Sequence, residues 1–262
     1  MHLFTGVSLF TAVLLTAGCS KGLHTGETPS TSKTGEAPVQ EIKVSSAVVT
    51  NMNGFAFRLM NKIQETEPEQ DNIFVSPLSL HMDLGMLLNG AEGNTYDEMA
   101  KLLDVNNLSL EDINKVYGTL LDKLPNIDPK VKLGLYNSVW YKKLIPFEPD
   151  YLKGLKDDFQ AEVSGLDFKS TDTSYINKWV RDKTNNKIQK VLDKIDGQDV
   201  MYLLNALYFK GSWSTQFEKS KTIDADFHLE NGQTSRVKMM NNTDDFFHYD
   251  GVDYAAIRLP YG

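Results

Sequence analysis

The sequence predicts an α+β fold with helices mostly first and strands after them, and three observations support this prediction. Apolar residues recur at helical spacing through most of residues 45–158. Residues 200–213 form an apolar run with one amide, Asn205, in its middle. Short alternating segments follow that run. Because a strand that is hydrophobic on both faces must have both faces covered, we expect 200–213 to lie at the centre of a sheet.

The first helix is expected to begin at Ser45. Its apolar side chains fall on a single stripe: Val48, Met52, Phe55, Ala56, Leu59 and Ile63. Residues 73–75 predict a short buried strand. Ser76 then acts as the N-cap of a second helix, with Pro77 at its first position and Asn89-Gly90 at its end. The predicted buried stripe of this helix is Leu80, Leu84, Leu87 and Leu88.

Two more helix starts carry local signals. Thr95 and Glu98 have the spacing of a capping box, and Ser109 caps a further helix that Pro125 ends. Strict alternation then predicts a strand over 131–141, with one face made of Val131, Leu133, Leu135, Asn137, Val139 and Tyr141. The following elements are expected to be a helix at 149–158, a strand at 161–166, and an amphipathic helix over 176–195 that bends at 184–187.

The end of the chain is rich in predicted strands. They are expected at 227–229, 236–240, 246–249 and 254–259, and Asn231-Gly232 is a hairpin turn signal. No internal repeat is evident, so we expect one domain over 45–262.

Composition limits the classes of function. Apolar residues make up 41% and charged residues 24%, which is ordinary for a globular protein with a sizeable core. The net charge of −8 argues against a nucleic-acid partner, because binding phosphates requires a basic face.

The first 44 residues predict export. Residues 1–18 have the apolar run of a signal peptide, too short to span a bilayer. Thr16-Ala-Gly-Cys19 resembles a bacterial lipobox, in which the cysteine is lipidated; a plain secretory signal or a free buried cysteine is the alternative. Residues 19–44 are rich in Ser, Thr, Gly, Pro, Lys and Glu and are expected to form a flexible tether. Since Cys19 is the single cysteine, no internal disulfide is possible.

No active site is evident, and we expect neither an enzyme nor a cofactor. The five histidines show no metal-binding spacing, and there is no nucleophile elbow or phosphate-binding glycine loop. His228 and His248 are expected to be partly exposed structural residues. The carboxylate pairs at 157–158 and 244–245 lie in charged segments, where a solvated surface is the simplest explanation.

Six segments, in order, resemble the serpin family of protease inhibitors. They are 72–80, 88–98, 176–188, 205–213, 238–240 and 259–262, and the resemblance as a whole covers about 45–262. The resemblance implies helices packed around a large mixed main sheet with smaller sheets beside it. It also implies that the C-terminal portion of such a domain, with its reactive loop and cleavage site, is missing from this chain.

The resemblance assigns roles to four residues. Ser76, Ser79 and Asn205 would form a polar cluster, the gate, that holds the main sheet closed until the reactive loop inserts. Trp213 would lie where the inserting loop enters. Each residue also has a plain structural explanation: an N-cap for Ser76, a tight helix contact for Ser79, a bulge for Asn205 and a core aromatic for Trp213. Trp179 is expected to anchor its helix in the core.

The serpin resemblance further implies a monomer that inhibits serine or cysteine proteases. The lipobox-like signal and the tether imply that the protein is anchored through Cys19, in the periplasm or on the outer surface. Without a reactive loop, this chain is expected to be inactive. Two alternatives stay open. One is a non-inhibitory binding protein with the same fold. The other is the non-folding product of an interrupted gene, because 200–209 would expose an unpaired apolar edge.

Overall fold

The computed structural model describes residues 42–67, 72–229 and 231–262. They form two compact units. Unit 1 contains the described residues up to Ile127 together with Leu133–Phe209, and unit 2 contains Asp128–Lys132 and Lys210–Gly262. The predicted signal 1–18, Cys19 and most of the tether 19–44 lie outside the described residues. None of the described helices is long and apolar enough to cross a membrane.

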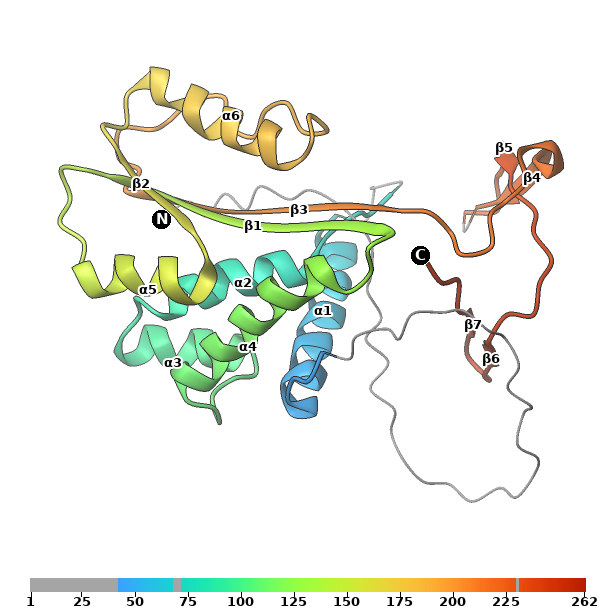
Figure 1. The fold of residues 1–262 in the computed structure, drawn as a ribbon, viewed down its shortest axis with the longest axis horizontal. Coiled ribbons are helices and arrows are strands. Elements are labelled where there is room, and N and C mark those ends of the chain that lie inside the picture. Colours follow the sequence, from blue (N-terminus) through green and yellow to red (C-terminus); the bar gives the residue numbers. More distant parts are fainter. Residues whose placement is uncertain (1–41, 68–71, 230) are drawn as a thin grey trace. The chain divides into compact units, whose positions relative to one another are not determined.

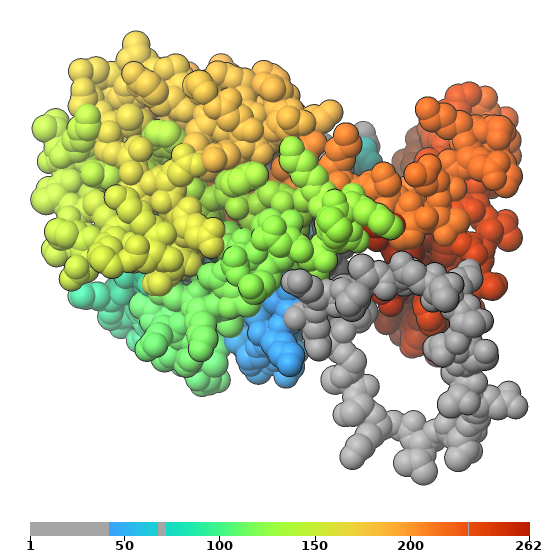
Figure 2. Space-filling view, in the orientation of Figure 1, coloured from blue at the N-terminus to red at the C-terminus, as the bar shows by residue number. Residues whose placement is uncertain are grey.

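Unit 1 holds the helices of this fold. They are α1 (Ser46–Thr66), α2 (Pro77–Leu88), α3 (Gly93–Leu102), α4 (Leu110–Lys123), α5 (Pro149–Phe159) and α6 (Thr173–Lys183), with 3-10 turns at Leu124–Asn126 and Ser170–Asp172. Their side chains close into a continuous surface, from α1 in blue to α6 in gold (Figure 2). The predicted caps at Ser76 and Ser109 are confirmed, since each hydroxyl accepts a hydrogen bond from the backbone amide three residues later.

A three-stranded sheet in the order β2-β1-β3 crosses this unit. The strands are β1 (Val131–Lys142), β2 (Glu162–Leu166) and β3 (Met201–Gly211). β1 and β2 run parallel. The amide of Lys142 donates to the carbonyl of Val200 at 3.0 Å, so the end of β1 lies beside the start of β3 and these two strands run antiparallel. The predicted central position of 200–213 is therefore wrong among the described strands: β1 is central and β3 is at an edge.

Both faces of β3 are nevertheless covered, as predicted. In Figure 1, α6 lies over one face of the sheet, here called the α6 face, and α2 with α1, α3, α4 and α5 lies under the other, the α2 face. Alternate residues of β3 divide between them: Tyr202, Leu204 and Ala206 pack with α6, and Leu207 packs with the larger core around α2.

Unit 2 consists of hairpins. β4 (Ile223–His228) pairs antiparallel with β5 (Thr234–Met239), and β6 (His248–Asp250) pairs antiparallel with β7 (Ala255–Ile257); a 3-10 turn at Lys219–Lys221 precedes β4. The Asn231-Gly232 turn prediction is confirmed, because it joins β4 to β5 and Gly232 adopts a φ of 80°. Glycine accepts this left-handed conformation without steric cost.

Several local predictions are wrong, each for a physical reason. Residues 73–75 form no strand, and Phe74 is 40% exposed, because no described strand pairs with them. Thr95 does not cap α3, which already begins at Gly93. The helix predicted over 176–195 ends at Lys183. There Asn185 and Asn186 take positive φ angles and turn the chain.

Helix α2 is buried more completely than its predicted stripe. Leu88 is fully buried, but Leu80, Leu84 and Leu87 are only partly buried. The remaining buried positions of this helix are His81, Met82, Asp83, Gly85 and Met86. A helix that is covered on most sides belongs to the centre of a fold, and this position brings two ionisable side chains into the core.

Candidate functional site

Asn205 lies on the α2 face of β3 and is only 3% exposed. Its Nδ2 donates to Asn137 Oδ1 at 2.7 Å and lies 3.9 Å from the sulfur of Met82. Asn137, on the neighbouring strand β1, donates in turn to the carbonyl of Phe159 at 2.8 Å. A chain of amides therefore ties β3 to β1 and to the end of α5 inside the core.

The two predicted serines form a pair of their own. The hydroxyls of Ser76 and Ser79 lie 2.9 Å apart, and the Ser79 amide donates to Ser76 Oγ at 3.3 Å. In the described part of the chain, no hydrogen bond joins either serine to Asn205. The two serines thus pair with each other at the start of α2, while Asn205 pairs with Asn137 across the strands, and the role of the three residues as a gate stays a prediction.

Sequence reasoning missed Asp83, which is 5% exposed on α2. Burial raises the pKa of its carboxyl group to about 8, and a hydrogen bond from the backbone amide of Asn205 opposes that rise. Its Oδ1 and the Oδ1 of Asn205 are both buried without a partner among the described residues. The signal that could have revealed it is a single carboxylate inside an otherwise apolar helix.

His81 also lies in the core, on the same helix. Its Nε2 donates to the carbonyl of Leu103 at 3.3 Å, which leaves Nδ1 to accept the hydroxyl of Tyr117 at 2.8 Å. Burial lowers the pKa of His81 to about 4, so the ring is neutral at neutral pH. The uncharged ring therefore links α2 by hydrogen bonds to the end of α3 and to α4.

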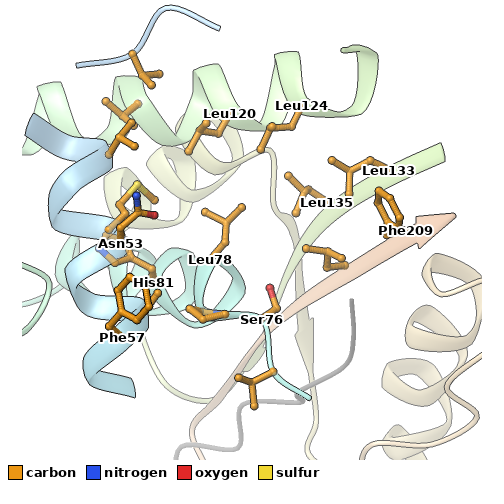
Figure 3. A pocket seen from close by; sticks show the side chains of 18 of the residues that line it. Asn53, Phe57, Ser76, Leu78, His81, Leu120, Leu124, Leu133, Leu135 and Phe209 are labelled. Atoms are coloured by element: carbon orange, nitrogen blue, oxygen red, sulfur yellow. The ribbon is translucent and has the colours of Figure 1, made fainter. Parts of the chain in front are cut away.

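A cavity of about 450 Å³ adjoins this region within unit 1. Figure 3 shows Ser76, Leu78 and His81 on one side of it and Leu133, Leu135 and Phe209 from the two strands on another. The lining is mainly aliphatic. Ser76, one member of the serine pair, thus also lines an apolar space beneath β1 and β3.

The comparisons with known proteins agree with this architecture. The family model described as Serpin (serine protease inhibitor) matches residues 50–262. The chain belongs to the serpin family. It is 31% identical to Serpin A12 of Rattus norvegicus, covering 100% of this chain and 64% of that protein. It is 33% identical to a leukocyte elastase inhibitor of Equus caballus, over 79% of this chain and 56% of that protein.

Solved structures give the same result. The thermophilic serpin tengpin in its native state is 34% identical, with a TM-score of 0.74 over 86% of this chain and 57% of that one. Tengpin in its latent state matches equally well in fold, with a TM-score of 0.74. The predicted α+β serpin fold is therefore confirmed, and the chain spans somewhat more than half of these relatives.

Trp213 of this serpin lies in unit 2, where it joins an aromatic stack. Its ring stacks on Tyr261 with centroids 4.3 Å apart and meets the edge of Phe217 at 6.0 Å. A bridge between Trp213 and Tyr261 and a hydrogen bond from the Ser214 amide to the Pro260 carbonyl fix the two segments together. This packing gives Trp213 a structural role, and its role in loop insertion stays a prediction.

The remaining candidates have structural partners. No group of three or more metal-binding side chains occurs among residues 42–67, 72–229 and 231–262. Asp157 pairs with Lys153, and Asp158 accepts a hydrogen bond from Asn114. His228 and His248 are exposed on hairpin strands. Trp179 is 6% exposed in the α6 core, which confirms its predicted place as an anchor.

Proposed function

We propose that the intact form of this serpin is a protease inhibitor that traps its target by inserting its reactive loop as a new strand beside β3, and that the chain 1–262 without that loop is inactive. The observation that carries the proposal is the state of β3: both faces are covered, yet no described strand lies on its outer side. An edge strand presents main-chain donors and acceptors to any strand added beside it. Among the described strands, the order β2-β1-β3 makes β3 the strand beside which the proposed loop would insert.

The amide chain at Asn205 supports a gating role next to that position. A hydrogen bond between strands is either made or broken, and it can form again in another arrangement. Separating packed apolar side chains instead costs free energy in proportion to the area that is exposed. The bond between Asn205 and Asn137 can break and re-form when the sheet opens. We propose that it, with the Ser76–Ser79 pair, sets how readily the sheet accepts the loop.

The proposed targets are serine or cysteine proteases, and the protein itself would act as an inhibitor and not as an enzyme. Three relatives carry the name leukocyte elastase inhibitor, which names leukocyte elastase as the target of those proteins. We further propose an exported monomer, held to a membrane through Cys19 and the tether 19–44, either in the periplasm or on the outer surface. The proposal includes no nucleic-acid partner, because binding phosphates requires a basic face and the net charge of this chain is −8.

The test is a covalent complex. The protein purified from the cells that make it is incubated with a chymotrypsin-like protease and, separately, with a papain-like protease. We expect a band of the summed mass that survives boiling in detergent. The recombinant chain 1–262 serves as the matched control and is expected to give no such band.

Cleavage without a complex, by either protease, would overturn the inhibitory mechanism. That outcome would favour a non-inhibitory binding protein on the same scaffold. A recombinant 1–262 that is wholly unprotected in hydrogen exchange would instead favour a product that does not fold alone.

A further inference from the structure

Three Asn-Gly pairs occur in the chain, and their backbone environments differ. Asn53-Gly54 lies inside α1, Asn89-Gly90 lies at the C-terminal end of α2, and Asn231-Gly232 lies in the turn between β4 and β5. In an Asn-Gly pair the backbone nitrogen after the asparagine can attack the side-chain amide with little hindrance, because glycine has no Cβ. The surroundings of each pair therefore determine whether this attack occurs.

The hairpin pair is open to the reaction. Asn231 and Gly232 are both exposed, and the Nδ2 group of Asn231 donates to no acceptor among the described residues. The amide of Gly232 donates to the carbonyl of Leu229 at 3.0 Å, so this bond must be released before the nitrogen can attack. Exposed loop tips open at lower cost than the interiors of helices, so this release is the easiest of the three.

A further amide of the turn assists the attack. The backbone amide of Gln233 donates to Asn231 Oδ1 at 2.9 Å. When a nucleophile adds to the carbon of a carboxamide, negative charge develops on this oxygen, and a fixed N–H donor stabilises that charge. The turn thus leaves the departing Nδ2 group free and holds the oxygen that must carry the charge.

The other two pairs are protected. Asn89 Nδ2 donates to the carbonyl of Gly85 at 2.8 Å and to Asn114 Oδ1 at 3.0 Å, and Asn89 Oδ1 accepts from Asn114 Nδ2 at 2.8 Å. Loss of Nδ2 there would break both of its bonds. Asn53 is exposed, but Gly54 lies in the interior of α1, where the helical hydrogen-bond ladder holds its amide.

We propose that Asn231 is a site of spontaneous deamidation, at which the asparagine becomes aspartate or isoaspartate. The nitrogen of Gly232 gives its proton to hydroxide and attacks Cγ of Asn231. The new C–N bond closes a cyclic imide, the bond from Cγ to Nδ2 breaks, and ammonia leaves with a proton taken from water, which restores the hydroxide. Water then opens the imide. The net reaction consumes one water, releases one ammonia and needs no oxidant or cofactor.

The two products differ in their effect on the hairpin. Opening at the side-chain carbonyl gives aspartate, which adds one negative charge to the turn. Opening at the backbone carbonyl gives isoaspartate, which adds the same charge and one methylene to the main chain. Because His228 pairs with Thr234 next to the turn, we expect isoaspartate to loosen this pair first. The reaction requires no protease, so it is independent of the proposed function.

Peptide mapping of the aged protein tests the site. The full chain is kept in mildly alkaline native buffer and, in parallel, in concentrated guanidinium chloride, and its tryptic peptides are followed by tandem mass spectrometry. In native buffer we expect Asn231 to convert roughly tenfold or more faster than Asn53 and Asn89, because those sites must first open. In denaturant we expect the three rates to agree within about threefold, because the protecting structure is lost.

Asn231→Gln is the matched control. It keeps an amide at the turn, but its longer side chain reaches the Gly232 nitrogen only through a larger ring, so we expect conversion at least about tenfold slower. Equal rates at the three Asn-Gly pairs in native buffer, or a faster rate at Asn53 or Asn89, would overturn the proposal. So would conversion of Asn231→Gln as fast as that of the unaltered protein.

Discussion

The two faces of β3 are held by different kinds of contact. On the α6 face, its residues pack into a cluster of large apolar side chains: Trp140, Phe168, Ile176, Trp179, Val180, Leu192, Tyr202, Leu204 and Ala206. On the α2 face, the middle of the strand meets polar groups, namely the side chain of Asn137 and the carboxyl group of Asp83. The α6 face is thus apolar throughout, whereas on the α2 face hydrogen bonds in the middle of the strand accompany the apolar packing of Leu207.

This difference indicates which face can release the strand. Apolar contact is lost in proportion to the area exposed, at about 25 cal/mol per Å², so separating the α6 face costs energy throughout the movement. A hydrogen bond contributes only about 0.5–1.5 kcal/mol net, and it can be exchanged for another. We therefore expect α6 to move with β3, and the α2 face to be where β3 changes partners.

The largest expected effect is on the α6 face. Trp179→Ala removes a ring that is 6% exposed, and such truncations cost about 3–5 kcal/mol in free energy of unfolding. Urea unfolding followed by circular dichroism measures the loss. Tyr175→Ala, one turn earlier on α6 and 57% exposed, is the control and should change stability by less than about 0.5 kcal/mol. Equal losses in the two variants would show that α6 does not anchor the strand.

The next largest effect is a loss of folding stability in acid, which we expect from His81 on α2. Burial lowers the pKa of His81 from 6.5 to about 4, so the unfolded chain takes up a proton at a higher pH than the folded protein does. The stability contributed by the neutral ring is therefore complete above pH 6.5 and is lost as the pH falls through 6.5 towards 4. At about 1.4 kcal/mol per unit of pKa difference, the loss is roughly 3 kcal/mol.

His81→Gln keeps a hydrogen-bonding side chain and removes this titration. Urea unfolding of the two proteins at about pH 4.5 and pH 7 gives the comparison. We expect the variant to be less stable at pH 7 but to lose less stability on acidification. Asp83 titrates with the opposite sign, so the informative quantity is the difference between the two proteins at each pH. Parallel pH profiles would contradict the assignment to His81.

The sequence could predict elements whose signals are local. Ser76 and Ser109 cap helices because their hydroxyls reach amides three residues away, and Asn231-Gly232 lies in the short turn between His228 and Thr234. The alternation over β1 also placed Asn137 on the apolar face, where it contacts Asn205. Local chemistry decided these features, so one stretch of sequence sufficed.

Features that depend on distant partners could not be read in this way. Residues 73–75 have strand composition, but strand formation requires a neighbour to pair with. Beyond α6, the segment around Leu192 is held by the side chain of Asn177, which donates to the Leu192 carbonyl at 2.7 Å, and not by helical bonds. Asp83 was missed because a carboxylate is expected to be exposed, and only the fold shows that β3 covers it.

The smallest expected effect is at the pair of amides that links β3 to β1. Asn205→Ala leaves Asn137 Oδ1 buried without its donor at 2.7 Å, which costs about 1–3 kcal/mol in free energy of unfolding. Asn137→Ala removes the other partner, and the double variant completes a cycle whose coupling should be about 0.5–3 kcal/mol. Additive losses would mean that the two amides do not act together, and the polar character of the α2 face would then reduce to Asp83 and the serine pair. We expect the two amides to be coupled, and hydrogen exchange in these variants to become faster in β3 but to stay unchanged in α6. That result would show that β3 is released on the α2 face.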